Sequence, residues 1–420
     1  MSKKYYGFLT TNALACLCLS MPVQSQEEGF LEGSKASVNV RNYYFTRDFK
    51  GSDPTQSKSS AWTQNFILDY QSGFTKGTVG VGLDVLGTSS FKLDAGKGAG
   101  ATQMLPIHDD GDPAKSYGRL GVAGKMKISK TELKVGEWMP VLPILRSDDG
   151  RSLPQTFRGG QITSREFKNW SFYGGQMRET SLRQDASMEK MAYSNGRGSI
   201  GRSNRFNFGG VEYNFNDNKT QVGVWGGQLK DVYKQGLISL KHEQPLGDWV
   251  LKANTGFFIG KEDGSKRAGN LDNRTLYGLF SANYNHHTFY AGLQHLAGDS
   301  AWMRVTGTSG GTLANDAFTT SADQPKERSW QVRYDYDFTG LNVPGLTMMI
   351  RYIKGTDVKN NLTEDGKEWA RESELAYLFT EGKLKNLSIK WRYSSLRQSW
   401  NKNGRFDEHR IIVNYPISFL

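Results

Sequence analysis

Seven cationic residues stand at alternate positions within short segments that mix polar and apolar residues. They are Arg41, Arg47, Arg333, Arg351, Lys390, Arg392 and Arg410. Successive side chains of a β-strand point to opposite faces, so in each segment the cation would lie on the face opposite the apolar side chains. An arginine guanidinium binds a carboxylate through two parallel hydrogen bonds and does not lose its proton. A row of such side chains predicts binding of small anions, and of carboxylates above all.

Acidic residues on the same faces would limit how tightly an anion is held. Asp335 and Asp337 alternate with Arg333, and Asp149 stands in a separate polar stretch. These carboxylates could also receive an ammonium group. Because we count far fewer acids than cations on the expected faces, a track for anions is favoured. The alternative for any single arginine is an ion pair that only stiffens the protein.

The elements that would position these residues are β-strands. The segment 330–338, WQVRYDYDF, places aromatic or apolar residues such as Trp330 and Tyr334 on even positions and polar ones on odd positions. The same period of two recurs in the segments 35–47, 62–70, 79–85, 346–352, 387–393 and 409–415. With 48 glycines, 11 prolines and 12% aromatic residues, the composition suits strands and turns. No apolar run after residue 25 reaches the ~18 residues that a helical membrane span requires.

Connections between these segments alternate in length. Tight turns are expected at 216–219, 246–248 and 285–287, and long polar connections at 87–117, 263–274 and 298–328. Short turns on one rim and long loops on the other are typical of outer-membrane barrels, and units of roughly 22 residues give about 18 strands. The last segment, 411–420, alternates up to the end of the chain, as expected if it pairs with the first strand, although Phe419 is penultimate. The sequence predicts an all-β, transmembrane, antiparallel up-and-down barrel.

A membrane barrel turns its apolar face outward. A charge on the lipid face costs ~2–4 kcal/mol at the bilayer midplane, whereas a wet lumen accepts it. Arg333 is therefore expected to face the lumen. Several aromatic residues are expected to face lipid or form an interfacial girdle, and a sugar-stacking slide in the lumen is the alternative. These aromatic residues are Trp62, Tyr70, Trp330, Tyr334, Trp391 and Tyr415.

The first 25 residues have the composition of an export signal. Lys3 and Lys4 precede an uncharged stretch, and small residues follow near Ser25. An N-terminal membrane anchor is the alternative. We expect residues 1–25 to be a signal peptide and 26–420 to form the barrel. Both cysteines, Cys16 and Cys18, lie in the signal, so the mature chain would have no thiol.

The mature chain would be basic without resembling a nucleic-acid-binding protein. Residues 1–25 hold two of the 53 Lys and Arg residues and none of the 42 Asp and Glu residues, which leaves an excess of nine cations. This excess suggests anionic partners. The cations are spread singly along strands rather than clustered, and an exported chain rarely meets nucleic acid, so no nucleic-acid partner is expected.

Signals for catalysis are weak. The six histidines show no metal-binding spacing except the adjacent pair at 286 and 287, whose side chains would point apart on a strand. No cofactor and no metal are expected, and nothing selects a catalytic triad. A channel is therefore expected rather than an enzyme. An outer-membrane barrel hydrolase or an adhesin remains the alternative.

Several stretches resemble porins of the OprD family, the substrate-specific outer-membrane channels of pseudomonad-like Gram-negative bacteria. They are GFLEGSKA at 29–36, RNYYFTRD at 41–48, LDYQSGFT at 68–75, SKTELKVG at 129–136, MPVLP at 139–143, DGRSLPQTFRGG at 149–160 and NYPIS at 414–418. The likeness covers the first half of the chain and the last strand. Between about 180 and 410 only the pattern matches.

The resemblance implies a barrel of 18 strands narrowed by an inward-folded third loop, with a ladder of arginines and lysines. Members take up small solutes that carry a carboxylate, among them basic amino acids, aromatic acids and short organic acids. Asp149, Arg151 and the segment 154–160 match the constricting loop, and Asp299 loosely matches an acidic lining position. The positions that match the ladder are Arg41, Arg47, Arg183, Lys390, Arg392 and Arg410.

Further partners follow from this expectation. They are outer-membrane lipid, lipopolysaccharide and the barrel assembly machinery, and the protein would be a monomer or weak trimer in the outer membrane of a Gram-negative bacterium. The sequence does not select one solute, because basic amino acids and aromatic acids would both use the arginine row. The width and acid content of the constriction would separate them.

Overall fold

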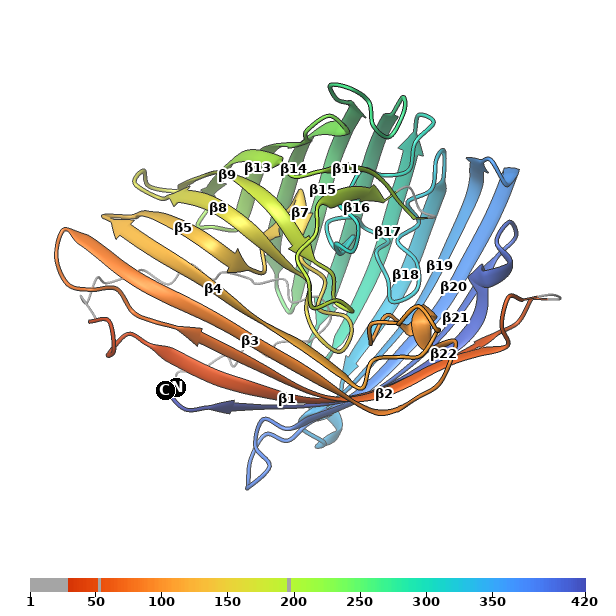
Figure 1. Cartoon of the computed structure of the whole chain (residues 1–420), viewed down its shortest axis with the longest axis horizontal. Coiled ribbons are helices and arrows are strands. Elements are labelled where there is room, and N and C mark those ends of the chain that lie inside the picture. The colour runs from red at the N-terminus through yellow and green to blue at the C-terminus, as the bar shows by residue number, and fades with distance from the viewer. Residues whose placement is uncertain (1–28, 52–53, 195–197) are drawn as a thin grey trace.

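A computed structural model describes residues 29–51, 54–194 and 198–420. These residues form one sheet of 18 antiparallel strands that closes into a barrel (Figure 1). The strands are β1 (Lys35–Phe49), β2 (Lys58–Gln71), β3 (Val79–Ala95), β4 (Ser116–Ile128), β5 (Thr131–Trp138), β8 (Thr156–Ser164), β9 (Trp170–Ser181), β12 (Phe206–Phe215), β13 (Thr220–Leu229), β14 (Tyr233–Leu246), β15 (Trp249–Glu262), β16 (Asp272–Tyr284), β17 (His287–Ala297), β18 (Arg328–Asp337), β19 (Leu346–Asn360), β20 (Thr363–Leu378), β21 (Ser388–Gln398) and β22 (Arg405–Ser418). The predicted fold class and strand number are confirmed.

The remaining elements are short. They are the strand pairs β6 (Val141–Leu142) with β7 (Leu145–Arg146) and β10 (Met191–Ser194) with β11 (Ser199–Ser203), and the 3-10 turns η1 (Ala99–Thr102), η2 (Phe338–Leu341) and η3 (Lys402–Gly404). Within the described ranges, no helix combines the length and apolar character needed to cross a membrane. The expected signal peptide, residues 1–25, lies outside the described residues.

The barrel closes where the first strand meets the last. β1 and β22 pair antiparallel along nearly their whole length, from Ser37 opposite Ser418 to Phe49 opposite Phe406. The expectation that the C-terminal strand pairs with the first one is confirmed. The start of β1 and the end of β22 lie at the same rim of the barrel. This rim carries the short turns, and the opposite rim carries the long connections.

The tight turns lie where the sequence predicted them. Between β12 and β13, the three residues Asn216, Asp217 and Asn218 all have positive φ, at 55°, 54° and 62°. Asn and Asp tolerate this left-handed conformation better than other residues, which explains the turn at that point. One predicted boundary is wrong. The long connection was expected to begin at Gly87, but β3 continues to Ala95, because polar inward side chains are normal in a wet barrel.

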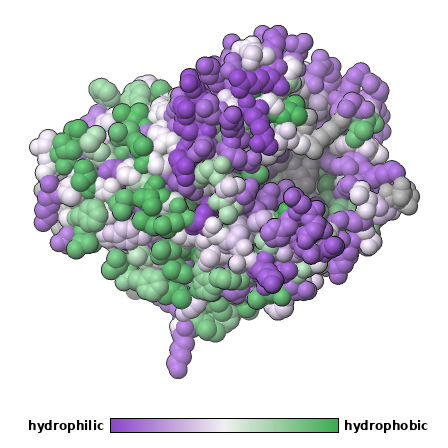
Figure 2. All heavy atoms as spheres, in the orientation of Figure 1, coloured by the Kyte–Doolittle hydropathy of each residue, from purple (hydrophilic) through white to green (hydrophobic). Residues whose placement is uncertain are grey.

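Side chains alternate between lipid and lumen as predicted. On β18, Trp330 and Val332 are 42% and 52% exposed on the outside, whereas the neighbouring inward residue Gln331 is 3% exposed. Figure 2 shows hydrophobic side chains gathered at the left and bottom of the view, and hydrophilic ones at the top and right. The aromatic face of WQVRYDYDF therefore faces outward, and Arg333 faces the interior.

Three long connections fold into the barrel and fill one side of it with an apolar core. Their described parts are residues 139–155, 182–194 with 198–205, and 298–327, and Figure 1 shows β7 and β11 within the ring of strands. Buried residues from these connections include Leu142, Ile144, Leu145, Met191, Tyr193, Trp302, Met303, Val305 and Leu313, and they pack with Phe206, Trp225, Phe258, Tyr277 and Leu296 of the wall. This packing occupies the inner faces of β12 to β17. The inner faces of β18–β22 and β1, here called the charged wall, border the remaining lumen.

Candidate solute-binding site in the lumen

Neighbouring strands bring the predicted cations together on the charged wall. Arg392 of β21 lies directly opposite Arg410 of β22, and Arg333 of β18 lies opposite Arg351 of β19. The wall carries all seven cations that alternation selected, namely Arg41, Arg47, Arg333, Arg351, Lys390, Arg392 and Arg410. Because cross-strand neighbours are about 5 Å apart, these side chains form a continuous band.

Glutamates that the sequence reasoning missed neutralise much of this band. Glu372 of β20 lies opposite Arg351, and the Nη2 of Arg351 donates to its Oε2 at 2.5 Å. Glu408 of β22 receives two guanidinium groups, the Nη2 of Arg47 at 2.6 Å and the Nε of Arg410 at 2.5 Å. The prediction that cations far outnumber acids on these faces is therefore wrong.

The remaining arginines of the band also have carboxylate partners. Arg333 binds Asp335, two residues further along the same face of β18, at 2.6 Å, and Arg392 binds Glu374 of β20. The alternating segment EWARESE at 368–374 could have disclosed Glu372 and Glu374, since it places both on one face. Every arginine of the band is thus held in place by a carboxylate. Its remaining N–H groups could donate to an incoming anion.

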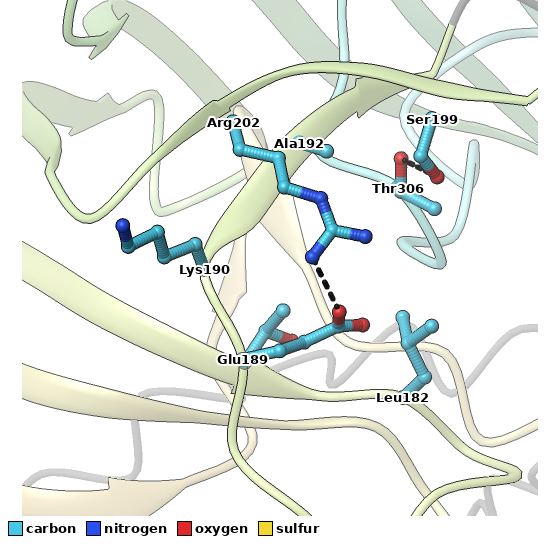
Figure 3. Close-up of a pocket in the computed structure, with 8 residues that line it drawn as sticks. Leu182, Glu189, Lys190, Ala192, Ser199, Arg202 and Thr306 are labelled. Atoms are coloured by element: carbon cyan, nitrogen blue, oxygen red, sulfur yellow. Dashed lines mark hydrogen bonds and ion pairs between the residues drawn. The ribbon is translucent and has the colours of Figure 1, made fainter.

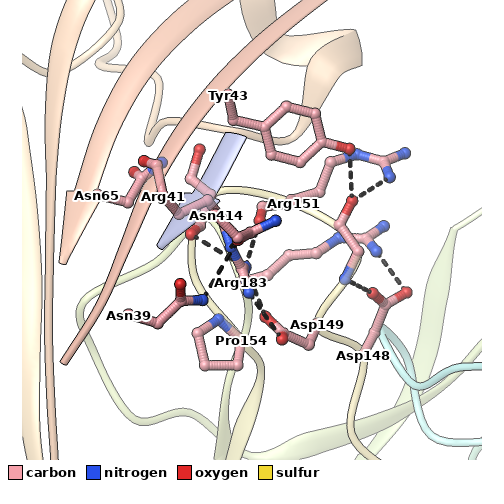
Figure 4. Close-up of polar contacts among 12 residues, drawn as sticks. Asn39, Arg41, Tyr43, Asn65, Asp148, Asp149, Arg151, Pro154, Arg183 and Asn414 are labelled. Atoms are coloured by element: carbon pink, nitrogen blue, oxygen red, sulfur yellow. Dashed lines mark hydrogen bonds and ion pairs between the residues drawn. The ribbon is translucent and has the colours of Figure 1, made fainter. Parts of the chain in front are cut away.

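The connection 139–155 is anchored to the charged wall through Asp149. Arg41 donates from Nη1 and Nη2 to the two carboxylate oxygens of Asp149, at 2.7 and 2.9 Å (Figure 4). The same Nη1 donates to the backbone oxygen of Arg151 at 2.9 Å, and the hydroxyl of Tyr43 donates to that of Gly150 at 3.0 Å. The inward-folded constriction loop that the resemblance implied is present.

Arg183 joins the constriction from a different connection. Its Nη1 donates to the Oδ2 of Asp148 at 2.5 Å, and its Nη2 donates to Gln103. Burial alone would raise the pKa of Asp148, but the nearby Arg183 and Arg151 outweigh it and hold that pKa below its usual value. Asp148 therefore stays ionised and ties the two connections together.

Arg151 is buried at the constriction and pairs with no carboxylate in the ranges that the structure describes. It is 7% exposed, and it donates to the backbone oxygens of Thr102 and Gly150 at 2.9 and 2.8 Å. Burial, with Arg410 and Arg183 nearby, lowers the pKa of Arg151 to about 9. The guanidinium therefore remains charged at neutral pH, as arginines in proteins do.

Residues 316–319 of the connection 298–327, here called the loop tip, lie on the arginine band. Arg351 donates to the backbone oxygen of Asp316 at 3.1 Å, and Arg410 donates to that of Phe318 at 2.8 Å. The phenyl ring of Phe318 lies 4.1 Å from the guanidinium carbon of Arg392. The loop tip therefore offers the band oxygen acceptors in the manner of a bound carboxylate.

Lys390 differs from the arginines of the band. Within the part of the chain that the structure describes, its ammonium group makes no hydrogen bond and no ion pair. It lies on β21 opposite Ile412 and Ala376, one step along the strand from Arg392. Its charge is therefore available to a solute.

One predicted site residue lies apart. The side chain of Asp299 is 84% exposed and pairs with Lys326 at 3.0 Å, so the structure does not bring it to the charged wall. A cavity between connections, shown in Figure 3 between Arg202, Glu189, Ser199 and Thr306, has a volume of about 20 Å³. That volume holds about one water molecule. A cavity of this size is too small for an organic solute.

Comparisons with known proteins agree with this architecture. The family model described as outer membrane porin, OprD family, matches residues 28–419. The chain is 54% identical over 415 residues to the porin-like protein GalP of Pseudomonas putida, covering 99% of this chain and 98% of that protein. Among solved structures, a BenF-like porin from Pseudomonas fluorescens Pf-5 is 60% identical with a TM-score of 0.91. OccK2 (OpdF) of Pseudomonas aeruginosa in complex with glucuronate is 53% identical with a TM-score of 0.86. Both structural comparisons cover 93% of this chain and 100% of the solved chain. The chain belongs to the OprD family of outer-membrane porins.

Proposed function

We propose that this porin is a passive, selective uptake channel for small solutes that carry a carboxylate, and that the arginine and lysine band is their track. As a member of the family, the protein lies in the outer membrane of a Gram-negative bacterium. The observation that carries the proposal is the surplus of cationic donors on the charged wall and at the constriction. Glu408 is shared by Arg47 and Arg410, whereas Arg151 and Lys390 bind no carboxylate among the described residues.

The band can bind a carboxylate without a large desolvation cost. A solute that enters the lumen loses water, and guanidinium groups in a low-dielectric wall replace that water with charge-assisted hydrogen bonds. The backbone oxygens of Asp316 and Phe318 already accept such bonds from Arg351 and Arg410. A solute carboxylate would exchange with these oxygens and then pass to the next cation.

The carboxylates of the protein keep the affinity low enough for release. Arg333, Arg351 and Arg392 each have an acidic partner, so a solute only competes for donors that are partly satisfied. A channel conducts when each site binds well enough for entry and weakly enough for exit. The ion pairs are therefore part of the transport track, as well as of the barrel's stability.

The solute class remains wider than one compound. Glucuronate is bound in the solved structure of OccK2, and a carboxylate is the group of glucuronate that a cationic band would recognise. The carboxylate of Asp149 is 41% exposed at the constriction and could receive an ammonium group. Organic acids, aromatic acids and amino acids all fit this arrangement.

Single-channel recording in planar bilayers tests the proposal. We expect ion current that small carboxylates reduce, and we expect Arg392→Gln and Arg410→Gln to weaken that reduction while the barrel stays folded. Glutamine is preferred to glutamate because Glu408 and Glu374 lie beside these arginines. Lys252→Gln is a matched control, since Lys252 pairs with Glu243 on the inner face of β15, away from the band.

The same recording separates this proposal from the alternative of a barrel hydrolase or adhesin. An enzyme or adhesin of that kind would show no substrate-sensitive current and would act through its external loops. Unchanged reduction of current in both arginine variants would remove those residues from the track. The export signal at residues 1–25, the monomeric or weakly trimeric state and recognition by the assembly machinery remain predictions.

A further inference from the structure

A group of basic and aromatic side chains covers part of the outer surface of β19 to β22. Cross-strand pairing places Lys354 opposite Trp369, Trp369 opposite Arg397, and Arg397 opposite Arg405. Arg371 lies two residues beyond Trp369 on the same face of β20. We name Lys354, Trp369, Arg371, Arg397 and Arg405 the outer basic patch. Figure 1 shows its four strands side by side at the right.

The alternation of exposure shows that the outer basic patch faces away from the lumen. On β20, the inward residues Glu368, Ala370 and Glu372 are 2%, 0% and 3% exposed. The intervening positions share their face with Leu375 and Tyr377, which are 41% and 37% exposed. The patch is therefore on the side of the barrel that contacts the membrane, and it has no part in the solute track.

Along the strands, the patch lies beyond the apolar band. On β21, Ile389 and Trp391 are 41% and 47% exposed on the outer face, and Arg397 follows close to the end of the strand. On β22, Arg405 is the first residue and Ile411 is 44% exposed further along the same face. In each case the cation is nearer the rim of the long connections.

That rim is the external one. Outer-membrane barrels have short periplasmic turns and longer external loops, and the chain ends of β1 and β22 lie at the short-turn rim. The outer basic patch is therefore at the level where the acyl chains of the outer leaflet meet their headgroups. Tryptophan side chains such as Trp369 are typical of this interface.

Most of the charge in the patch is not neutralised by the protein. In the described part of the chain, the side chains of Lys354, Arg371 and Arg405 form no ion pair and no hydrogen bond. Arg371 lies 5.2 Å above the ring of Trp369. Among the described residues, Arg397 is the one cation of the patch with a carboxylate partner, Asp407, at 2.8 Å. Three cations at a lipid interface therefore face the membrane without a counter-charge.

We propose that the outer basic patch binds the phosphate groups of a glycolipid in the outer leaflet. Phosphate oxygens accept several charge-assisted hydrogen bonds from arginine and lysine. The partly exposed ring of Trp369 would pack against the sugar or the upper acyl chain. Polybasic segments at a membrane surface attract anionic lipids in the same way. The occupant is therefore a phosphorylated lipid and not a soluble anion.

Native mass spectrometry of the full-length protein in lipid nanodiscs tests this inference. The probes are lipid A with two phosphates and the same lipid A with both phosphates removed. The test variant is the triple substitution Lys354→Gln, Arg371→Gln and Arg405→Gln. We expect wild-type protein to retain the phosphorylated probe, and the variant to lose at least about tenfold in retention, since each cation near the surface contributes to binding.

A second triple variant serves as a matched control. Lys58→Gln, Lys234→Gln and Lys261→Gln remove exposed lysines of β2, β14 and β15 and should leave retention unchanged. Single-channel current reports that each variant forms a folded barrel, independently of lipid binding. Equal retention by wild-type protein and the test variant would overturn the inference. So would an equal loss in the control, or equal retention of the probe without phosphates.

Discussion

The guanidinium of Arg41 and the carboxylate of Asp149 are joined by two parallel hydrogen bonds of 2.7 and 2.9 Å, which fix the constriction loop to the first strand. The side chain of Arg41 is 9% exposed, and that of Asp149 is 41% exposed. One partner is thus held in the wall while the other reaches the lumen. The pair is a structural tether, and in the proposed track its exposed carboxylate is also the group that a passing solute would meet.

Asp149→Asn should make the channel more selective for anions. The substitution removes a negative charge at the constriction, while Arg41 keeps its bonds to the backbone of Arg151 and to Asn414. Because Asp149 is partly exposed, the loss of stability should be about 1 kcal/mol or less. The reversal potential in a salt gradient measures the selectivity. A shift toward cations, or no shift, would contradict this prediction.

The pair of Arg351 and Glu372 should behave as a buried ion pair. Their side chains are 6% and 0% exposed, so Glu372→Gln leaves a buried guanidinium without its counter-charge and should cost about 3 kcal/mol of stability. Replacing both partners by Met and Leu should cost less, because no buried charge remains. Urea denaturation in detergent or bilayer measures both. The idea fails if the double variant is the less stable one.

Phe318→Ala should enlarge the current and increase its fluctuations. The ring contacts Arg392 and Arg351 at 4.1 and 5.2 Å, and such contacts are each worth about 1 kcal/mol. Without them the loop tip is held less firmly and the passage is wider. Phe318→Leu, which keeps the bulk, is the control. An unchanged conductance in the alanine variant would show that the ring does not border the passage.

The attachment of the connection 298–327 should weaken as pH rises. Burial and the neighbouring carboxyl of Glu368 raise the pKa of Glu327 well above its usual value, and burial raises the pKa of Asp316 in the same connection to about 6. Asp323, which pairs with Arg304 at 2.8 Å, adds negative charge to this group. A folded state with a raised carboxyl pKa favours the protonated acid.

Because these carboxyl groups have raised pKa values, the attachment of the connection 298–327 is strongest at low pH. The stabilisation that the protonated carboxyl groups give to this connection is complete below their ordinary pKa. It is lost as pH rises through their raised pKa values, which for Asp316 means between 3.8 and about 6. Current fluctuations should therefore increase between pH 5 and pH 8, and Glu327→Gln should reduce that dependence. Glu243→Gln, on the opposite wall, is the control. Equal pH dependence in Glu327→Gln and wild-type protein would contradict the account.

The alternation of polar and apolar residues predicts which side chains of each strand face the lumen. A period of two decides which residues face the lumen once the apolar face is assigned to lipid, and this alone located Arg333, Arg392 and Arg410. The same rule, applied to residues 363–378, would have found Glu372. That strand does not stand out in the sequence because its outer face carries Lys367, Trp369 and Arg371, at the membrane interface, in place of a plain apolar series.

The constriction was harder to predict because its residues belong to connections without a period. The family resemblance alone predicts a place for Arg151 in the constricting loop, and it is also what assigns Asp149 to that loop. The contacts of Phe318 depend on how a connection of 30 residues, 298–327, folds back onto β20 to β22, and no local pattern encodes that path. A loose motif match also selects Asp299, which lies exposed beside Lys326.

The central claim is that cations in the lumen select solutes by their carboxylate. Its most direct test compares the rates at which proteoliposomes take up glucuronate and glucose, which differ mainly in that group. Wild-type protein should take up glucuronate faster, and Lys390→Gln should reduce this preference about tenfold, the value of one charge-assisted hydrogen bond. Equal uptake of the two sugars by wild-type protein would contradict the claim.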